Sequence, residues 1–229
     1  MSATCANCAR WSTTRHASPQ VYGSPQRRVY LMSSVPNTAS APDRQLVLNA
    51  KSHQEYISAV EEYPALRVEY LNGDIIMTPA RSPHHQIISG NLSLLLGHFA
   101  KENGLGLVLA APLDVVLSRE AQIVQPDLIF ITKARAAKVL GKAAVNGAPD
   151  LMIEILSPST VRADRKIKLP LYAHHQVPEY WIVDPEDQSV EIYMLEGDSY
   201  RVGGIFMSGD AIAIGAFADA HIIVDSIFA

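Results

Sequence analysis

Two acidic residues set inside apolar runs constrain this chain more than any other feature. Asp127 lies within the run 123–131 and Glu154 within the run 151–156, and both runs are rich in β-branched residues. Such runs are typical of buried strands. A carboxylate buried there is unfavourable unless it is paired, protonated or bound to a cation. Two of them on neighbouring strands predict a hard-metal site. The alternative places both carboxylates outward on half-exposed strands, but the continuity of the apolar runs favours the metal.

Four short motifs follow one another in the second half of the chain. They are Gln125-Pro126-Asp127, the segment 150–160 that contains Glu154 and ends in Ser157-Pro158-Ser159-Thr160, the pair Lys168 and Tyr172, and the segment 179–185. In this order they resemble the Uma-type restriction endonuclease family, a branch of the PD-(D/E)XK nuclease superfamily. The resemblance covers residues 47 to 229. It implies an α/β fold with a restriction-endonuclease-like mixed β-sheet core flanked by helices.

The resemblance also implies a function, a DNA endonuclease that hydrolyses phosphodiester bonds with a Mg²⁺-activated water, Mn²⁺ serving as a substitute. The implied metal ligands are Asp127, Glu154 and the carbonyl oxygen of Ile155. Such oxygen donors suit Mg²⁺, which one or two carboxylates usually hold together with waters and substrate phosphate. The implied catalytic set is Asp127, Glu154, Lys168 and Glu69, with His85 and Tyr172 as supporting residues. The implied partners are DNA and a second copy of the chain in a homodimer.

The sequence departs from the superfamily pattern at Leu156, which stands where the third motif residue would be lysine. The resemblance implies that Lys168, on the following helix, supplies this charge. An ordinary i,i+4 ion pair with Asp164 is the alternative role of Lys168. Tyr172, one helical turn further on, could fix the lysine or contact phosphate, or equally pack in a half-buried position.

Glu69 and His85 also admit two interpretations. Glu69 follows Arg67 by two residues, so both lie on the same face of a predicted strand. Family members carry a glutamate here in the acidic cluster, whereas the alternative is a surface ion pair with an arginine or lysine. His85 lies in the first turn of a predicted helix, either near the scissile phosphate or simply at the polar surface beside the helix cap.

The charge balance is compatible with more than one class of partner. The chain has 19 basic and 23 acidic residues, and its first 45 residues hold five arginines and one aspartate, which leaves a net charge of −8 for the remainder. Proteins that depend on non-specific duplex affinity are usually basic. Two alternatives to a nuclease therefore stay open: a non-catalytic nucleic-acid or protein interaction module on the same fold, and a metal-dependent hydrolase of small phosphoesters. Two basic clusters offset the acidity, Lys133, Arg135, Lys138 and Lys142, and Arg162, Arg165, Lys166 and Lys168.

Composition divides the chain into a predicted disordered tail, 1–45, and a single domain, 46–229. The tail is rich in Ser, Thr, Ala, Pro and Arg and has no helical or strand periodicity. Translation starting at Met32 is an alternative. Cys5 and Cys8 lack a second Cys/His pair at zinc spacing, and no structural disulfide is implied, so a cytoplasmic location is expected. No apolar run approaches the roughly 20 residues that span a bilayer, so no membrane association is expected.

The remaining patterns predict one mixed sheet with helices against it. A capping box at Ser52 begins a helix that Pro64 ends, and Asn72-Gly73 predicts a hairpin between strands 66–71 and 74–78. Ser82 and Pro83 begin a helix that Gly104 ends. Pro170 predicts a kink or break near Lys168 in the helix 161–174. The other expected elements are strands 106–111, 113–117, 178–183, 189–195, 200–206 and 220–228, and a helix 133–140, besides the strands of Asp127 and Glu154.

Overall fold

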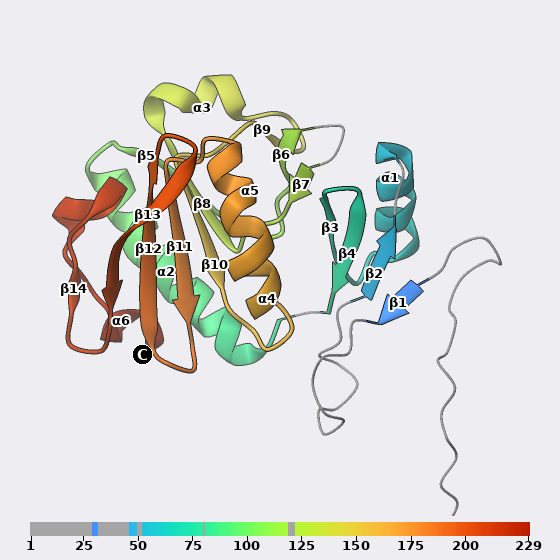
Figure 1. Cartoon of the computed structure of the whole chain (residues 1–229). Helices are drawn as coiled ribbons and strands as arrows, with labels where there is room; N and C mark the ends of the chain where they lie inside the picture. The colour runs from blue at the N-terminus through green and yellow to red at the C-terminus, as the bar shows by residue number, and fades with distance from the viewer. Residues whose placement is uncertain (1–28, 32–45, 50–51, 80, 119–121) are drawn as a thin grey trace, which may run out of the picture.

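A six-stranded mixed sheet lies at the centre of the structure (Figure 1). The computed structural model describes residues 29–31, 46–49, 52–79, 81–118 and 122–229. Strands β10 and β11 run parallel, and the other neighbours in this sheet run antiparallel. In spatial order the strands are β13 (Ser199–Phe206), β12 (Ser189–Glu196), β11 (Glu179–Asp184), β10 (Leu151–Ile155), β8 (Leu128–Thr132) and β5 (Gly106–Ala110).

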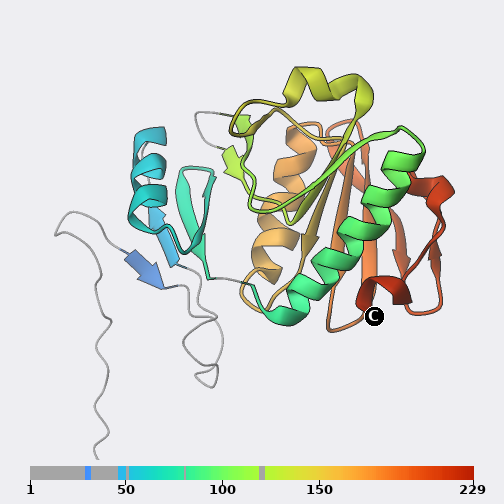
Figure 2. The ribbon, with the colours of Figure 1, turned by 180° about the vertical axis from the view of Figure 1, so that it is seen from behind.

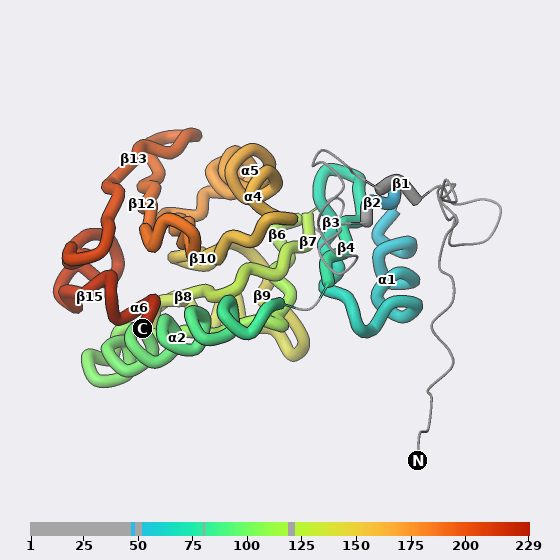
Figure 3. Tube along the Cα trace, turned by 90° about the horizontal axis from the view of Figure 1, so that it is seen from below, coloured from blue at the N-terminus to red at the C-terminus, as the bar shows by residue number. Residues whose placement is uncertain are grey.

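Helices cover both faces of this sheet, which explains why its central strands are continuously apolar. Figure 3 shows α2 (Pro83–Glu102) on one side of β10 and β8, and α4 (Val161–Ala163) with α5 (Leu169–His174) on the other. Alternate residues of β10 enter two different clusters: Leu151 and Ile153 pack with α2, and Met152 packs with Tyr172 of α5. This alternation confirms the prediction that the strand of Glu154 is buried on both faces.

A second sheet, seven-stranded within the described residues, lies beside the first. Among the strands that the structure describes in this sheet, only β6 and β9 pair in parallel. Helix α1 (His53–Glu62) packs on β3 through Tyr56 and Ala59 (Figure 2). Asn72 and Gly73, with φ of 52° and 89°, form the predicted turn between β3 and β4. The strand order is β1 (Val29–Leu31), β2 (Leu46–Asn49), β4 (Asp74–Thr78), β3 (Arg67–Leu71), β7 (Gln122–Val124), β6 (Val115–Ser118) and β9 (Val145–Asn146).

The helix after Glu154 changes its geometry where Pro170 predicts a break. Between α4 and α5, residues Asp164–Lys168 form a π-helix, η2. Proline removes an amide donor and clashes with the preceding turn, and the wider π turn ends directly before α5, whose second residue is Pro170. The expected irregularity near Lys168 is therefore present without interrupting the helical path.

Four expectations differ from the structure. The single strand expected around Asp127 is wrong, because the run divides into β7 and β8 and Asp127 lies in the link between them. The described residues form two large sheets and a small pair, β14 (Ala211–Ile212) with β15 (Ile222–Ile223), instead of one sheet. The expected strand 220–228 is wrong, because Asp225–Phe228 form helix α6, whose Ile227 packs against the α2 side of the core. Within the predicted tail, Val29–Leu31 pair with β2 as a strand, and the rest of 1–45, including Cys5 and Cys8, lies outside the described residues.

The remaining elements complete the layers. Helix α3 is Lys133–Val139, and a 3₁₀ segment, η3, covers Gly215–Ala220. Among the described residues, none of the helices combines the length and apolar character needed to cross a bilayer.

A buried carboxylate at the first position of β11 holds η3 against the central sheet. Glu179 of β11 is 2% exposed. It accepts hydrogen bonds from the Trp181 indole at 2.6 Å and from the Ala216 backbone amide at 2.7 Å. Gly215 has a φ of +71°, and a Cβ there would overlap the Glu179 carboxylate. Only glycine therefore allows the chain to approach so closely.

We predict that Gly215→Ala destabilises the protein by clearly more than Gly197→Ala. Gly197 also has a positive φ, +62°, but a Cβ there would meet open space. Gly197→Ala should cost about 1 kcal/mol from left-handed backbone strain alone, whereas Gly215→Ala adds roughly 1–3 kcal/mol of overpacking. Urea unfolding of both variants measures the difference. Equal losses would contradict the close contact between Gly215 and Glu179.

Candidate active site

The sequence-predicted acidic residues meet at the junction of the two sheets. Asp127 ends a three-residue link, 125–127, that joins β7 of the seven-stranded sheet to β8 of the six-stranded sheet. Glu154 lies in β10, next to β8. Glu69 projects from β3, the neighbour of β7. All three are at most 4% exposed. The order of strands in two sheets thus brings together carboxylates separated by up to 85 positions, Glu69 to Glu154.

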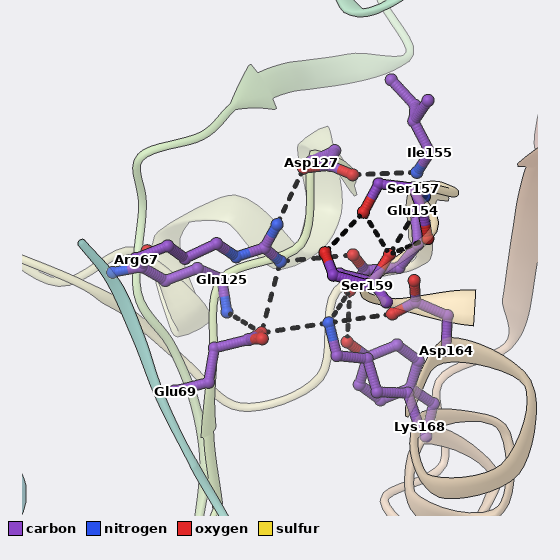
Figure 4. A network of polar contacts seen from close by, with 12 residues as sticks. Arg67, Glu69, Gln125, Asp127, Glu154, Ile155, Ser157, Ser159, Asp164 and Lys168 are labelled. Carbon is purple, nitrogen blue, oxygen red and sulfur yellow. Dashed lines mark hydrogen bonds and ion pairs between the residues drawn. The ribbon is translucent and has the colours of Figure 1, made fainter. Parts of the chain in front are cut away.

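An arginine lies between the three carboxylates (Figure 4). The Arg67 Nη1 atom is 2.9 Å from Asp127 Oδ1. Its Nη2 atom is 3.2 Å from Glu154 Oε2 and 3.3 Å from Glu69 Oε1. Because Arg67 and Glu69 are two residues apart on β3, their side chains lie on the same face of the strand. The Arg67 side chain is 10% exposed, so this positive charge is largely withdrawn from water.

Lys168 contacts the same cluster from the helical side. Its Nζ atom is 2.9 Å from Glu154 Oε1, 3.1 Å from Glu69 Oε1 and 3.2 Å from Asp164 Oδ1. The Tyr172 hydroxyl donates to Glu154 Oε1 at 2.8 Å. Both alternatives for Lys168 are thus realised together: it pairs with Asp164 at i,i+4, but at 1% exposure it is buried and also contacts two other acids. The idea of an exposed surface pair is wrong.

Asp127 is held from a third direction by the beginning of α2. Ser82 caps this helix by accepting from the His85 amide at 3.2 Å, which places the histidine ring in the first turn. His85 Nε2 is 3.2 Å from Asp127 Oδ2, and the same oxygen accepts from the Ile155 amide at 2.8 Å. The Arg81 Nη2 atom lies 3.4 Å from Asp127 Oδ1, and its Nη1 atom donates to Ser157 Oγ at 3.3 Å. His85 is therefore a buried contact of the cluster, and not a surface residue.

Burial and neighbouring charges shift the pKa values of these groups in different directions. Burial alone would raise the pKa of Asp127, but Arg67, the His85 hydrogen bond and Arg81 hold it well below its usual range. Burial raises the pKa of Glu154 to about 7, although Lys168 and Arg67 oppose the shift. Burial would lower the pKa of Lys168, but Glu154, Glu69 and Asp164 together raise it. Lys168 therefore remains a cation that donates hydrogen bonds and cannot accept a proton at neutral pH.

The oxygen atoms of this cluster fit a hard divalent cation in their chemistry. Asp127, Glu154 and the Ile155 carbonyl offer oxygen donors, as Mg²⁺ prefers. Within the part of the chain that the structure describes, no three His, Cys, Asp or Glu side chains are arranged as a ready metal site. Two carboxylates with waters and a substrate phosphate suffice for Mg²⁺, so the donor set fits, but Arg67 now contacts the two facing carboxylates.

A cavity of about 480 Å³ opens beside the cluster. Arg81, His85 and Ser157 belong both to its lining and to the contacts around Asp127. Leu156, which stands where the superfamily has lysine, also lines it, and packs in the apolar cluster of α5. Through this cavity, a molecule in the solvent can reach the edge of the acidic cluster.

The structure brings together all seven residues singled out from the sequence, and adds two arginines. Asp127, Glu154, Glu69, Lys168, His85, Tyr172 and the Ile155 amide form one continuous set of contacts. Sequence reasoning placed Arg67 on the face of Glu69 but gave it no role in the site, and it missed Arg81. The two-residue spacing was a usable signal for Arg67, whereas nothing local marked Arg81.

The fold and this buried acidic cluster define an α/β protein of the restriction-endonuclease-like class, and comparisons with known proteins identify the family. Residues 53–220 match the Uma2 family, described as "Putative restriction endonuclease". The chain therefore belongs to the Uma2 family of nuclease-like proteins. A crystal structure described as a "putative nuclease belonging to DUF820" from Anabaena variabilis is similar in fold, with a TM-score of 0.63 and 20% identity over 77% of this chain and 97% of that one. The uncharacterized protein slr1290 from Synechocystis is 27% identical over 72% of this chain and 82% of its own length.

We predict that Glu154 makes the metal-free protein less stable as the pH rises from about 4.5 to 7. Its pKa is raised from 4.5 to about 7 in the folded state. The folded state therefore binds more protons than the unfolded state across this window, and stability falls as the proton is lost. Thermal unfolding in EDTA at several pH values should show this slope in the wild type and a flatter one in Glu154→Gln. Parallel profiles would show that folding does not raise the pKa of Glu154.

Proposed function

We propose that this protein is a divalent-metal-dependent DNA endonuclease that uses Mg²⁺. The observation that carries the proposal is one buried network in which Asp127, Glu154 and Lys168 come from three different elements, the link before β8, the strand β10 and the π-helix η2. Membership of the Uma2 family supports nucleic acid as the substrate. DNA in preference to RNA, a homodimer and a cytoplasmic location stay predictions from the sequence.

In this proposal the carboxylates hold the cation. Asp127, Glu154 and the Ile155 carbonyl are the proposed ligands, and Glu69 completes the acidic set. A divalent cation in such a site supplies a bound water of lowered pKa and neutralises charge on the phosphodiester. The depressed pKa of Asp127 keeps this ligand ionised throughout the physiological range, whereas Glu154 loses its proton near pH 7. Metal binding should therefore strengthen as the pH rises through about 7.

The cationic side chains have the complementary role. Lys168 stays protonated and can donate to the attacking water or to the phosphate, because three carboxylates raise its pKa. Tyr172 donates to the Glu154 oxygen that also contacts Lys168, so it orients this carboxylate. Arg81 and His85 line the cavity where a phosphate group would approach. These positive and polar groups offset locally the acidic net charge of the chain.

We predict that Lys168→Met lowers DNA cleavage by about 10²-fold or more, the scale for loss of one positioned electrostatic donor. Because Lys168 is 1% exposed among acids, the change should also cost about 3–5 kcal/mol of stability. Cleavage is therefore measured at low temperature, after circular dichroism has shown that the variant is folded. Lys168→Arg should recover little activity, because a planar guanidinium does not replace a compact ammonium.

Lys166→Met is the matched control. Lys166 lies in the same π-helix but is exposed, so cleavage and thermal stability should stay at wild-type values. An equal loss of cleavage in both variants would indicate a diffuse phosphate-binding surface. Full activity in Lys168→Met would remove this lysine from the catalytic set.

The function itself is tested on supercoiled plasmid. We expect nicked or linear DNA with Mg²⁺ or Mn²⁺, none with EDTA, and none from Asp127→Asn. Plasmid binding without cleavage would favour the interaction module. Hydrolysis of a small phosphodiester such as bis(p-nitrophenyl) phosphate, without cleavage of plasmid, would favour the small phosphoester hydrolase.

A further inference from the structure

We propose that Arg67 and the divalent cation compete for the same two carboxylate oxygens, and that the displaced Arg67 then binds a phosphate of the nucleic acid. Arg67 would thus serve as the internal counter-ion of the metal-free site and as a substrate-binding residue of the metal-loaded one. This inference rests on the proposed metal-dependent function and adds the residue that sets its metal affinity.

Asp127 and Glu154 each have one oxygen that other protein groups already hold. Asp127 Oδ2 accepts from the Ile155 amide at 2.8 Å and contacts His85 Nε2 at 3.2 Å. Glu154 Oε1 accepts from Lys168 at 2.9 Å and from Tyr172 at 2.8 Å. One oxygen of each carboxylate is therefore already held by protein donors on the far side from Arg67. A cation that binds both carboxylates must use the remaining oxygens.

Those remaining oxygens are the two that Arg67 bridges. Arg81 also contacts Asp127 Oδ1, at the longer distance of 3.4 Å. Its Nη1 atom contacts Asp127 Oδ1 at 2.9 Å, and its Nη2 atom contacts Glu154 Oε2 at 3.2 Å. Mg²⁺ holds its oxygen ligands at roughly 2.1 Å, a distance at which it takes the lone pairs that now accept from the guanidinium. Like charges so close in a buried site also repel strongly. The two cations therefore exclude each other from this position.

The guanidinium is held in a way that permits its release. Within the described residues, its Nε atom has no hydrogen-bond partner, so the two terminal nitrogens carry its polar contacts. Arg67 is also the first residue of β3, where the strand begins. The incoming cation replaces its charge at Asp127 and Glu154, so the carboxylates do not lose their compensation when Arg67 leaves.

The net charge of the cluster shows how displacement of Arg67 would affect the binding of a phosphodiester. With every group ionised, the four acids Glu69, Asp127, Glu154 and Asp164 meet the three cations Arg67, Arg81 and Lys168. In this fully ionised form the metal-free cluster carries an excess of one negative charge and repels a phosphodiester. A divalent cation reverses the sign, and the freed guanidinium offers paired donors that match phosphate oxygens.

Calorimetric titration with Mn²⁺ tests the competition without reference to activity. The wild type, Arg67→Gln, Arg67→Lys and the control Arg165→Gln are first stripped of metal. Because apparent affinity is reduced by the fraction of molecules in the binding-competent state, and Arg67 occupies the site in the major state, Arg67→Gln should bind Mn²⁺ about tenfold or more tightly than the wild type. Arg67→Lys should also bind more tightly, since one ammonium cannot bridge both oxygens; a purely Coulombic effect would leave it at wild-type affinity and overturn the competition. Arg165 pairs with Asp184 and Glu191, so its variant should bind like the wild type.

The second half of the proposal is tested by DNA binding in Ca²⁺, a cation used here to occupy the site. The loss of one charged phosphate contact should weaken binding of Arg67→Gln about tenfold in Ca²⁺ and leave it no weaker than the wild type in EDTA. Equal DNA affinity in Ca²⁺ would overturn the phosphate-binding role. Equal Mn²⁺ affinity of all variants would overturn the competition while leaving a metal-dependent nuclease intact, and no Mn²⁺ binding by any of them would overturn both.

If Arg67→Gln does not fold, a crystal structure of the wild type with Mn²⁺ decides. The expected result is Mn²⁺ on Asp127 and Glu154, located by its anomalous signal, with Arg67 beyond hydrogen-bond distance of both oxygens. Mn²⁺ on these two residues with both Arg67 contacts retained would overturn the competition.

Discussion

The structure depends on positively charged side chains that neutralise several carboxylates buried at the junction of the two sheets. Glu69, Asp127, Glu154 and Asp164 are each at most 4% exposed, and none of them could remain ionised there alone. Arg67 and Lys168 provide most of the compensating charge from opposite sides of the cluster. The seven-stranded sheet contributes Arg67, and the helical layer contributes Lys168. The charge balance therefore joins the second sheet to the helical layer, beside the apolar cluster that both share.

The same compensation divides the chemical work between the groups. Asp127 is kept ionised by its arginine neighbours, and Glu154 keeps a proton up to about pH 7 because burial prevails. Two carboxylates with well-separated ionisation can act differently at one pH. Lys168 is fixed in its charged form by its acidic neighbours. The protonation state of each of these three side chains thus depends on the parts of the fold that surround it.

Much of this arrangement could be predicted from the sequence, where local patterns carry the information. The apolar run around Glu154 indicated a strand buried on both faces, and Asn72-Gly73 indicated the hairpin that carries Glu69. The irregular helix near Pro170 also followed from local chemistry. The apolar runs already paired Asp127 with Glu154 as a predicted metal site, and the resemblance to a nuclease family added Lys168 to them.

The sequence patterns could not predict which distant segments of the chain contact one another. The division into two sheets depends on the short link 125–127, where the apolar run continues on both sides and shows no boundary. The C-terminal segment reads as a strand because Ile222, Ile223 and Ile227 suit either structure, but packing against α2 makes its end helical. Arg81 could not be assigned, because its contacts with Asp127 and Ser157 span 46 and 76 positions.

The π-helix at Asp164–Lys168 limits how this segment can change in evolution. A π turn holds one more residue than an α turn, and losing that residue restores regular α geometry. Each residue of an α-helix turns the chain by about 100°, so an extra residue between Asp164 and Lys168, in a turn that is already widened, would rotate the following side chains away from Glu154. A deletion would instead convert the π turn into an α turn and shorten the spacing of Asp164 and Lys168 from four residues to three. Substitutions at exposed Lys166 can be tolerated, but an insertion in this turn cannot, because Lys168 and Tyr172 must both stay on the same carboxylate.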